Sequence, residues 1–277
     1  MNSIETEAVV DIKRRLSPAL DSPELQEVKQ LFSEIEAIQK TGSMPIVDLS
    51  GINLEGLDLS NISIKNLVLE ASVLTKTSFE DAVLVGANFK DAVLIRANLN
   101  GAKLNQANLT DSLMHLADMR GADFTGADLT GANLRDTDVN GAIFNEAIMI
   151  DCVFKDTKVD EANFTKTNLS RADFTDADIS DCVMKEADLS AATMVRTKFT
   201  NVNMRGADLS NADLTGAAPW TTDMTGANLE KANLTDSEFM SVEMKDANIK
   251  DIITTNSNLI IATQTHEDFM ELQAPDS

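Results

Sequence analysis

The chain has 277 residues and carries 45 acidic against 23 basic side chains, which gives a net charge of -22. Such an excess of acid disfavours binding to free nucleic acid or to an anionic membrane. Aromatic residues make up only 4% and tyrosine is absent. We therefore expect a fold with a narrow core and not a compact globule of this length.

The N-terminus contains no visible targeting segment. The first twenty residues include Glu5, Glu7 and Asp11 and no apolar run, as a secretory signal would need. No apolar stretch of the sequence is long enough to span a membrane. We therefore expect a cytoplasmic protein, and leave open export by a system that uses no hydrophobic signal.

Residues 1–46 are expected to form a helical N-terminal cap. Ser22 is a suitable N-cap and Pro23 suits the first helical position. An apolar stripe at helical spacing follows: Leu25, Val28, Leu31, Phe32, Ile35 and Ile38. This helix either covers the end of the next element, which would block edge-to-edge aggregation, or binds a partner protein.

Residues 47–261 repeat a pentad: a small residue, Asp or Asn, a large apolar residue, a polar residue and a turn-former. The register holds for 43 pentads without insertion, and the third position is large and apolar except at Pro219 and Thr254. Eleven of the 12 glycines occupy the fifth position, where a corner favours them. A period of five fits neither an α-helix nor a flat strand. It predicts a solenoid with the first and third positions pointing inward.

The stretch Ala122–Leu134 reads ADFTGADLTGANL, and such pentads resemble the pentapeptide-repeat family, A-(D/N)-L-X-X. The resemblance covers about three quarters of the chain. It implies an all-β solenoid, a right-handed quadrilateral β-helix with four pentads per coil, in which residues twenty apart stack on one face. At about 4.8 Å per coil, about 11 coils would make a rod roughly 50 Å long. We number the faces one to four from the pentad 47–51.

Two sets of residues should lie in the core of this solenoid. Phenylalanines stack at twenty-residue spacing and are expected to form interior aromatic ladders: Phe124, Phe144 and Phe164 on face four, and Phe154 and Phe174 on face two. Cys152 and Cys182 both occupy first positions, thirty residues apart. We expect small core residues there, not a disulfide.

Residues suited to catalysis are scarce. The only histidines are His115, on the coil surface, and His266, in the tail. No His/Cys cluster has metal-ligand spacing, no phosphate-binding loop is present, and no base accompanies the many Ser and Thr residues. We expect no enzyme activity, no cofactor and no metal.

Face two departs from the repeat in its N-terminal half. Its second positions include Val73, Val93 and Leu113 on consecutive coils, with Ile95 and Leu116 beside them. A contiguous apolar patch on a soluble rod more often marks an interface. The alternative is that the N-terminal segment folds back over it.

A second departure lies at residues 217–221. Pro219 replaces the inward apolar residue and cannot donate a rung hydrogen bond. Trp220 is the only tryptophan, and Met240 occupies the same outward position one coil later. The pair is either an interaction hot spot or a local bend with the indole lying flat on the rod.

Acidic residues are unevenly spread over the faces. Faces one to four carry net charges of -6, -2, -7 and 0. On face three the second positions 118–198 alternate acid with Lys158 and Lys198, which predicts a charge ladder between coils. On face one Asp188 and Asp208 stack like on like, which makes them candidates for a functional acidic face.

The C-terminal tail, residues 262–277, is expected to contain a short helix over 265–273. Ile253, Ile260 and Ile261 should face outward on the last coil. Either that helix covers them, or they form a homodimer contact together with Phe269. The family resemblance adds that topoisomerase-binding members carry their dimer contact at this end.

Two functions follow from these features. The absence of catalytic, metal-binding and phosphate-binding motifs, together with the apolar patch, favours a non-enzymatic scaffold rod that binds a protein partner through its faces. The resemblance implies the alternative, an acidic DNA mimic that protects or inhibits a type II topoisomerase, DNA gyrase or topoisomerase IV. Two observations argue against the mimic: the acid is divided between opposite faces, and no loop interrupts the register. A small-molecule site is disfavoured because inward residues fill the coil.

Overall fold

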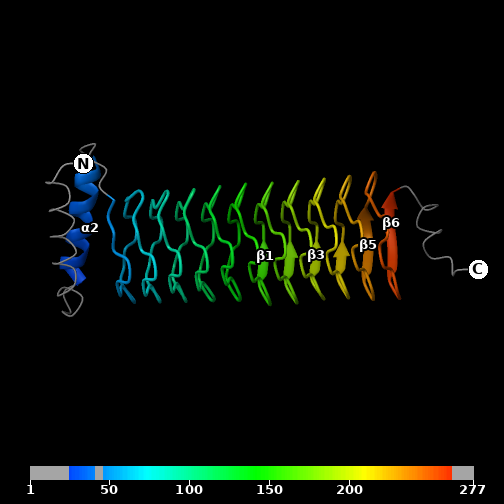
Figure 1. Cartoon of the computed structure of the whole chain (residues 1–277), viewed down its shortest axis with the longest axis horizontal. Helices are drawn as coiled ribbons and strands as arrows, with labels where there is room; N and C mark the ends of the chain where they lie inside the picture. Colours follow the sequence, from blue (N-terminus) through cyan, green and yellow to red (C-terminus); the bar gives the residue numbers. More distant parts are fainter. Residues whose placement is uncertain (1–24, 41–45, 264–277) are drawn as a thin grey trace, which may run out of the picture.

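The computed structural model describes residues 25–40 and 46–263. Helix α2 (Leu25–Lys40) lies at one end of a rod built from successive coils (Figure 1). Most coils are joined by isolated bridges, and six strands are longer: β1 (Lys158–Asp160), β2 (Asp178–Ser180), β3 (Lys198–Thr200), β4 (Ala218–Trp220), β5 (Glu238–Glu243) and β6 (Asn258–Thr263). The helix start at Ser22 and the helix over 265–273 lie outside the described residues.

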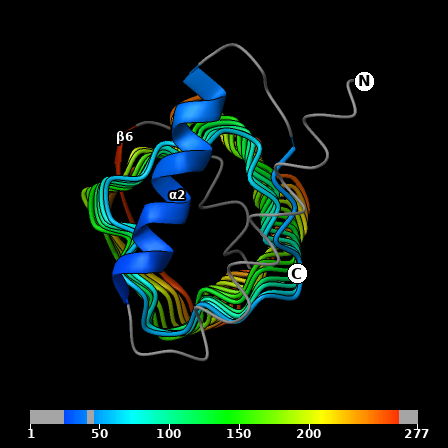
Figure 2. The same ribbon diagram turned by 90° about the vertical axis from the view of Figure 1, so that its left-hand side faces the viewer.

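Each coil takes twenty residues. Parallel bridges join a second-position residue to the one twenty positions later, from Asp48 with Val68 to Asn233 with Ile253. The strands β1 to β6 pair in chain order and in parallel on face three. Seen along the axis, the coils outline a four-sided ring (Figure 2). The expected parallel β-helix with four pentads per coil is therefore confirmed.

Three kinds of backbone hydrogen bond join neighbouring coils. A second-position amide donates to the first-position carbonyl of the previous coil, as Asn163 does to Ala142 at 2.9 Å. A third-position amide donates to a second-position carbonyl of the next coil, as Phe144 does to Asn163 at 2.7 Å. A fifth-position amide donates to the fourth-position carbonyl of the next coil, as Gly141 does to Asp160 at 3.0 Å. These bonds satisfy most of the backbone groups along the rod, as an extended ladder requires.

The fifth position is the corner of each pentad. From Gly51 to Asn256 every fifth-position residue has a positive φ, between 50° and 71°. The next amide often closes a four-residue turn, as Ala82 N does to Phe79 O at 3.0 Å. A positive φ at the third residue of such a turn is the type II geometry that favours glycine or asparagine. This explains why glycine is confined to this position in the repeat.

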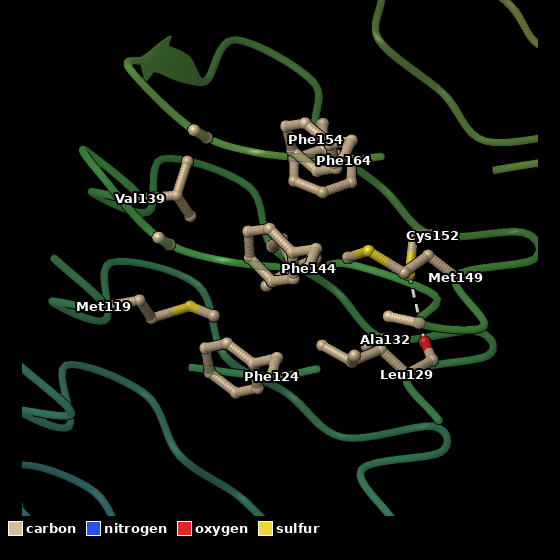
Figure 3. Packing of buried hydrophobic residues seen from close by; sticks show 14 of the residues in the cluster. Met119, Phe124, Leu129, Ala132, Val139, Phe144, Met149, Cys152, Phe154 and Phe164 are labelled. Carbon is tan, nitrogen blue, oxygen red and sulfur yellow. Dashed lines mark hydrogen bonds between the residues drawn. The ribbon is translucent and has the colours of Figure 1, made fainter. Parts of the chain in front are cut away.

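The inward residues fill the interior. Phe124, Phe144 and Phe164 stack with ring centroids 5.1 and 4.9 Å apart, and Phe154 stacks on Phe174 at 4.7 Å. Phe154 also meets Phe164 edge to face at 6.0 Å, and the rings lie together in the core (Figure 3). The expected aromatic ladders are confirmed.

First positions accept Ser, Thr and Cys for a definable reason. Their side chains donate to the third-position carbonyl 23 residues earlier, as Thr77 does to Leu54 and Thr167 does to Phe144. The Cys152 thiol follows the same rule, at 2.9 Å from Leu129 O (Figure 3). Cys152 and Cys182 are buried and free, as expected of core residues. Burial raises the pKa of Cys182 to about 12, so its thiol stays protonated.

Helix α2 covers the first coil (Figure 2). Leu31, Phe32 and Ile35 are buried against the solenoid core. Polar side chains of the helix also bond the coil edge: the Glu36 carboxylate accepts the Ser63 amide at 2.6 Å, and Gln39 exchanges two bonds with the backbone of Lys65. The helical N-terminal cap is confirmed, because this helix satisfies backbone groups that have no preceding coil.

Candidate functional site

An apolar column runs along face two. Val73, Val93 and Leu113 face one another on consecutive coils in strict register. Their side chains point outward, as second positions do; the valines are half-buried and Leu113 is 42% exposed. The structure therefore brings together the three residues predicted from the sequence.

Leu116 extends this column to the corner between faces two and three. It is 45% exposed and has a φ of 61°, a conformation that a bulky L-residue rarely adopts. Ile95 is half-buried on the coil before. We call Val73, Val93, Ile95, Leu113 and Leu116 the face-two patch. An exposed leucine held in a strained conformation favours function over packing as its reason.

No described segment covers the exposed residues of this patch. Helix α2 lies across the end of the rod, and residues 1–24, which were the alternative cover, lie outside the described residues. An equally exposed side chain, Ile148 at 42%, occupies a second position on face one. Sequence reasoning did not single it out, and its bridge partners Asp128 and Asn168 leave it without an apolar column.

The second departure from the repeat also places its two residues together. Trp220 pairs with Met240 in the β4–β5 register, and they are 61% and 40% exposed. Pro219 takes the inward third position. Thr221 follows at a φ of 50°, an unusual value for a β-branched residue.

At the C-terminal end β5 pairs with β6 through a register shift that sets the backbone of Ile261 opposite Val242. The side chain of Ile261 lies outside the described part of the structure, so its outward placement stays a prediction. Ile260 continues the Trp220–Met240 column in β6. Ile253 is 50% exposed, as expected. Phe269 lies outside the described residues, so the dimer contact stays a prediction.

The two acidic candidates on face one are indeed neighbours. Asp188 faces Asp208 in the bridge register. Each carboxylate, however, accepts the amide two residues later, at 2.9 Å from Ser190 N and from Ser210 N. Asp208 also accepts a bond from Asn228 at 3.0 Å. Stabilisation of the local turn is therefore enough to explain why an aspartate occupies both positions.

The predicted charge ladder on face three is wrong in its details. Neither Lys158 nor Lys198 lies within ion-pair distance of a carboxylate of the described residues, although their backbone registers with Asp138 and Asp178 as expected. The bidentate contacts between coils come from arginines at the corners: Arg171 with Asp151, and Arg196 with Asp176. The planar guanidinium fork reaches a carboxylate twenty residues earlier with two parallel bonds.

Beside Leu116 the surface of face three is hollowed by a shallow groove of about 540 Å³. Its lining was not predicted from the sequence: Leu116, Asp136, Thr137, Asp138, Asn140, Asp156, Lys158 and Asp160. Arg120 borders the groove; it holds Asp118 by two bonds of 2.8 and 2.6 Å and reaches Asp138 at 3.6 Å. This guanidinium lowers the pKa of Asp118.

The described residues contain no group of three or more His, Cys, Asp or Glu side chains placed to hold a metal ion. Within that same part of the chain, α2 is neither long nor apolar enough to serve as a membrane span. The features that stand out are thus surface features: the face-two patch, the groove and the Trp220–Met240 pair.

A twenty-residue coil with four outward faces and a filled interior defines a parallel β-solenoid. A family model described as pentapeptide repeats matches it in 8 copies, over residues 72–111, 116–146, 147–185, 182–217 and 222–253. The chain belongs to the pentapeptide-repeat family.

Several solved structures are similar to this chain. HetL, a pentapeptide repeat protein involved in heterocyst differentiation regulation from the cyanobacterium Nostoc sp. strain PCC 7120, is 24% identical over 84% of this chain and 98% of its own, with a TM-score of 0.43. Full-length QnrB1, a plasmid-mediated fluoroquinolone resistance protein, is 20% identical over 82% and 98%, with a TM-score of 0.32. Rfr23 from the cyanobacterium Cyanothece 51142 is 24% identical over 50% and 64%, with a TM-score of 0.13. These likenesses concern the fold. No curated protein matches the chain.

Proposed function

We propose that this chain is a non-enzymatic interaction rod that binds a protein partner through the face-two patch. The observation that carries the proposal is the column Val73–Val93–Leu113, three outward apolar residues in register on consecutive coils. Isolated surface apolar residues are ordinary, but a contiguous patch is typical of interfaces.

The rod gives up a local hydrogen bond at each residue of this column. At an ordinary second position the side chain accepts the amide two residues later, as Asp128 does from Thr130 N at 3.0 Å and Asn133 does from Arg135 N at 3.1 Å. Val73, Val93 and Leu113 cannot accept that bond. Three consecutive coils therefore forgo a local stabilising contact and keep an apolar surface in its place, which fits selection for a partner.

The test compares two substitutions that both restore the family residue. Leu113→Asn changes the patch, and Ile148→Asn changes an equally exposed second position on another face. We expect partners cross-linked to the wild-type chain in its native cell to be lost with Leu113→Asn and kept with Ile148→Asn. Equal recovery by the two variants would reject the proposal.

A second candidate, an acidic mimic of DNA, rests on charge density. Residues 47–261 carry a net charge of -15, which at about 4.8 Å per coil corresponds to about one negative charge per 3.4 Å of rod. A single DNA strand has the same spacing, about 3.4 Å per phosphate. The partner would then be DNA gyrase or topoisomerase IV. A mimic should inhibit or protect either enzyme in a supercoiling or decatenation assay, and Leu113→Asn should leave that effect intact. An unchanged assay at micromolar protein would eliminate this candidate.

A further inference from the structure

The backbone ladder opens at one place beside Leu116. Outside the strands, and apart from Pro219, which has no amide hydrogen, three bonds between coils in residues 47–243 fall outside good hydrogen-bond geometry, although the bridge between Asp138 and Lys158 persists. All three would join residues 136–139 to residues 155–158: Asp136 N to Lys155 O, Val139 N to Lys158 O, and Lys158 N to Thr137 O. Asp138 and Lys158 still face each other. The coils are therefore in register but locally parted, and we call this place the seam.

Two stacked threonines account for the seam. Thr157 donates to Leu134 O at 3.0 Å, the carbonyl 23 residues earlier, as first-position side chains normally do. Thr137, one coil before it, donates to the same Leu134 O at 2.6 Å, three residues back in its own turn. The amide of Thr137 also reaches that oxygen, at 3.3 Å. One carbonyl thus holds three donors, and the corner that contains Thr137 is drawn away from the next coil.

The groove of about 540 Å³ lies at the seam. Four carboxylates line it, those of Asp136, Asp138, Asp156 and Asp160, together with the Lys158 ammonium. Leu116 supplies an exposed apolar wall. The volume lies within the range of ordinary binding clefts, and the backbone bonds between the two coils are weakened beside it.

We propose that the seam groove binds an extended basic segment of the partner protein, with an apolar side chain of that segment packed on Leu116. This inference rests on the proposed function, because Leu116 belongs to the face-two patch. The net negative lining selects lysine or arginine. Because the two coils stay paired and offer no free sheet edge, side chains and not backbone bonds carry the contact. Leu116 shares the positive φ of every corner, so the corner sets its conformation, and the anchor role explains why a leucine is kept there.

The probe is a panel of fluorescein-labelled decapeptides, each with one leucine or isoleucine flanked by two to four arginines or lysines. Binding is measured by anisotropy at low salt. We expect micromolar binding to the wild-type chain. Thr137→Ala should weaken it at least about tenfold, because freeing Leu134 O lets the seam close. Leu116→Gly should weaken it similarly by removing the apolar wall.

The charge of the occupant has its own test. Lys158→Gln removes the one cation that lines the groove, so basic peptides should bind severalfold more tightly. Weaker binding would mean that the groove does not select a positively charged peptide, and would overturn the proposal. The control is the double variant Asp188→Asn with Asp208→Asn, which removes two charges on another face. It should change binding less than about twofold. A loss as large as that of Thr137→Ala would mean diffuse attraction to an acidic rod, and would also overturn the proposal.

The chain contains a basic segment of its own, Lys13-Arg14-Arg15. If the panel binds only after these three residues are replaced by glutamate in the full chain, the occupant is that segment and the partner proposal is wrong. Absence of binding in every variant overturns it as well. Failure of the proposed function looks different: Leu113→Asn would then keep the cross-linked partner while the groove variants still lose the peptides.

Discussion

Two adjoining regions of the rod follow the same repeat with different results. In Ala122–Leu134 each second-position side chain accepts the amide two residues later, and every bond to the next coil is made. One corner further on, at residues 136–139, three of those bonds fall outside good hydrogen-bond geometry, although Asp138 still bridges Lys158. The pentad builds the coil wherever it is followed closely. Single deviations, Leu116 and the Thr137–Thr157 stack, open a surface without disturbing the coils on either side.

This comparison separates the residues that build the coil from those that shape its surface. In a solenoid each coil contacts only its neighbours, so a local opening does not propagate. Residues that lower local stability are therefore tolerated, and they mark the positions where function is to be sought. The following experiments break the regular region or repair the irregular one, in decreasing order of expected effect.

The largest loss should come from the regular interior. Phe144 is fully buried and stacked between Phe124 and Phe164, 5.1 and 4.9 Å from them. Phe144→Ala would leave a cavity in a filled core, at a cost of about 3–5 kcal/mol. Urea unfolding followed by circular dichroism measures this loss, and Phe144→Leu should cost clearly less. Equal losses would mean that the ring stack, and not the filled volume, carries the stabilisation.

The seam should respond in the opposite direction. In Thr137→Ala the Leu134 carbonyl keeps Thr157 as its side-chain donor, and three weakened backbone bonds can shorten; a full bond of this kind is worth about 0.5–1.5 kcal/mol. We expect a net gain of about 1 kcal/mol, after the lost hydroxyl bond is counted. Amide hydrogen exchange is the direct measurement: Asp136, Val139 and Lys158 should become protected.

Thr167→Ala is the matched control. Thr167 has the ordinary bond to Phe144 O, at 2.6 Å, and that carbonyl accepts otherwise only the turn amide of Ala147, at 3.0 Å. Its removal leaves a buried carbonyl short of one partner and should destabilise by about 1 kcal/mol. If both threonine variants lose stability, the competition for Leu134 O is not what opens the seam.

Leu116 offers a smaller repair. Its φ of 61° is natural for glycine and costs about 1–2 kcal/mol for other L-residues. Glycine loses more backbone entropy on folding, so Leu116→Gly should stabilise by about 0.5–1 kcal/mol. A fall in the urea midpoint would show that the leucine contributes to packing. Stabilisation together with weaker peptide binding would separate the anchor role from any structural one.

The sequence predicted the regular region well and the irregular one poorly, for physical reasons. Twenty-residue stacking, inward phenylalanines and glycine corners follow from period and residue size. The seam forms because the Thr137 hydroxyl donates to Leu134 O in its own turn and not to the third-position carbonyl 23 residues earlier. Any first-position threonine could make either bond. Only the succession of Thr137 and Thr157 in one column could have pointed to it. The register shift at Ile261 depends likewise on how β5 leaves its corner, which no pentad position encodes.

The smallest effect lies in the same corner column as the seam. Asp136, Asp156 and Asp176 occupy successive coils, and only Asp176 has a two-bond arginine partner, with distances of 2.7 and 2.6 Å to Arg196. That contact lowers the pKa of Asp176 below its ordinary value of 3.8. A lowered folded-state pKa stabilises the fold above the ordinary value, and this contribution is lost as the pH falls through the folded value. Asp176→Asn should therefore be slightly less stable than wild type at neutral pH, and the difference should vanish in acid.

Because protonation of the whole acidic surface also changes with pH, the informative quantity is the difference in free energy of unfolding between wild type and Asp176→Asn at each pH. Asp136→Asn is the comparison within the column. Asp136 lies 3.3 Å from one nitrogen of Arg135, which also pairs with Asp156 at 3.0 Å. At neutral pH its loss of stability should be smaller than that of Asp176→Asn, since the shared arginine keeps its second partner. If Asp136→Asn loses as much stability as Asp176→Asn, the ion pair of Asp136 with Arg135 stabilises this corner. The seam would then be a stabilised feature of the rod and not an opening in it.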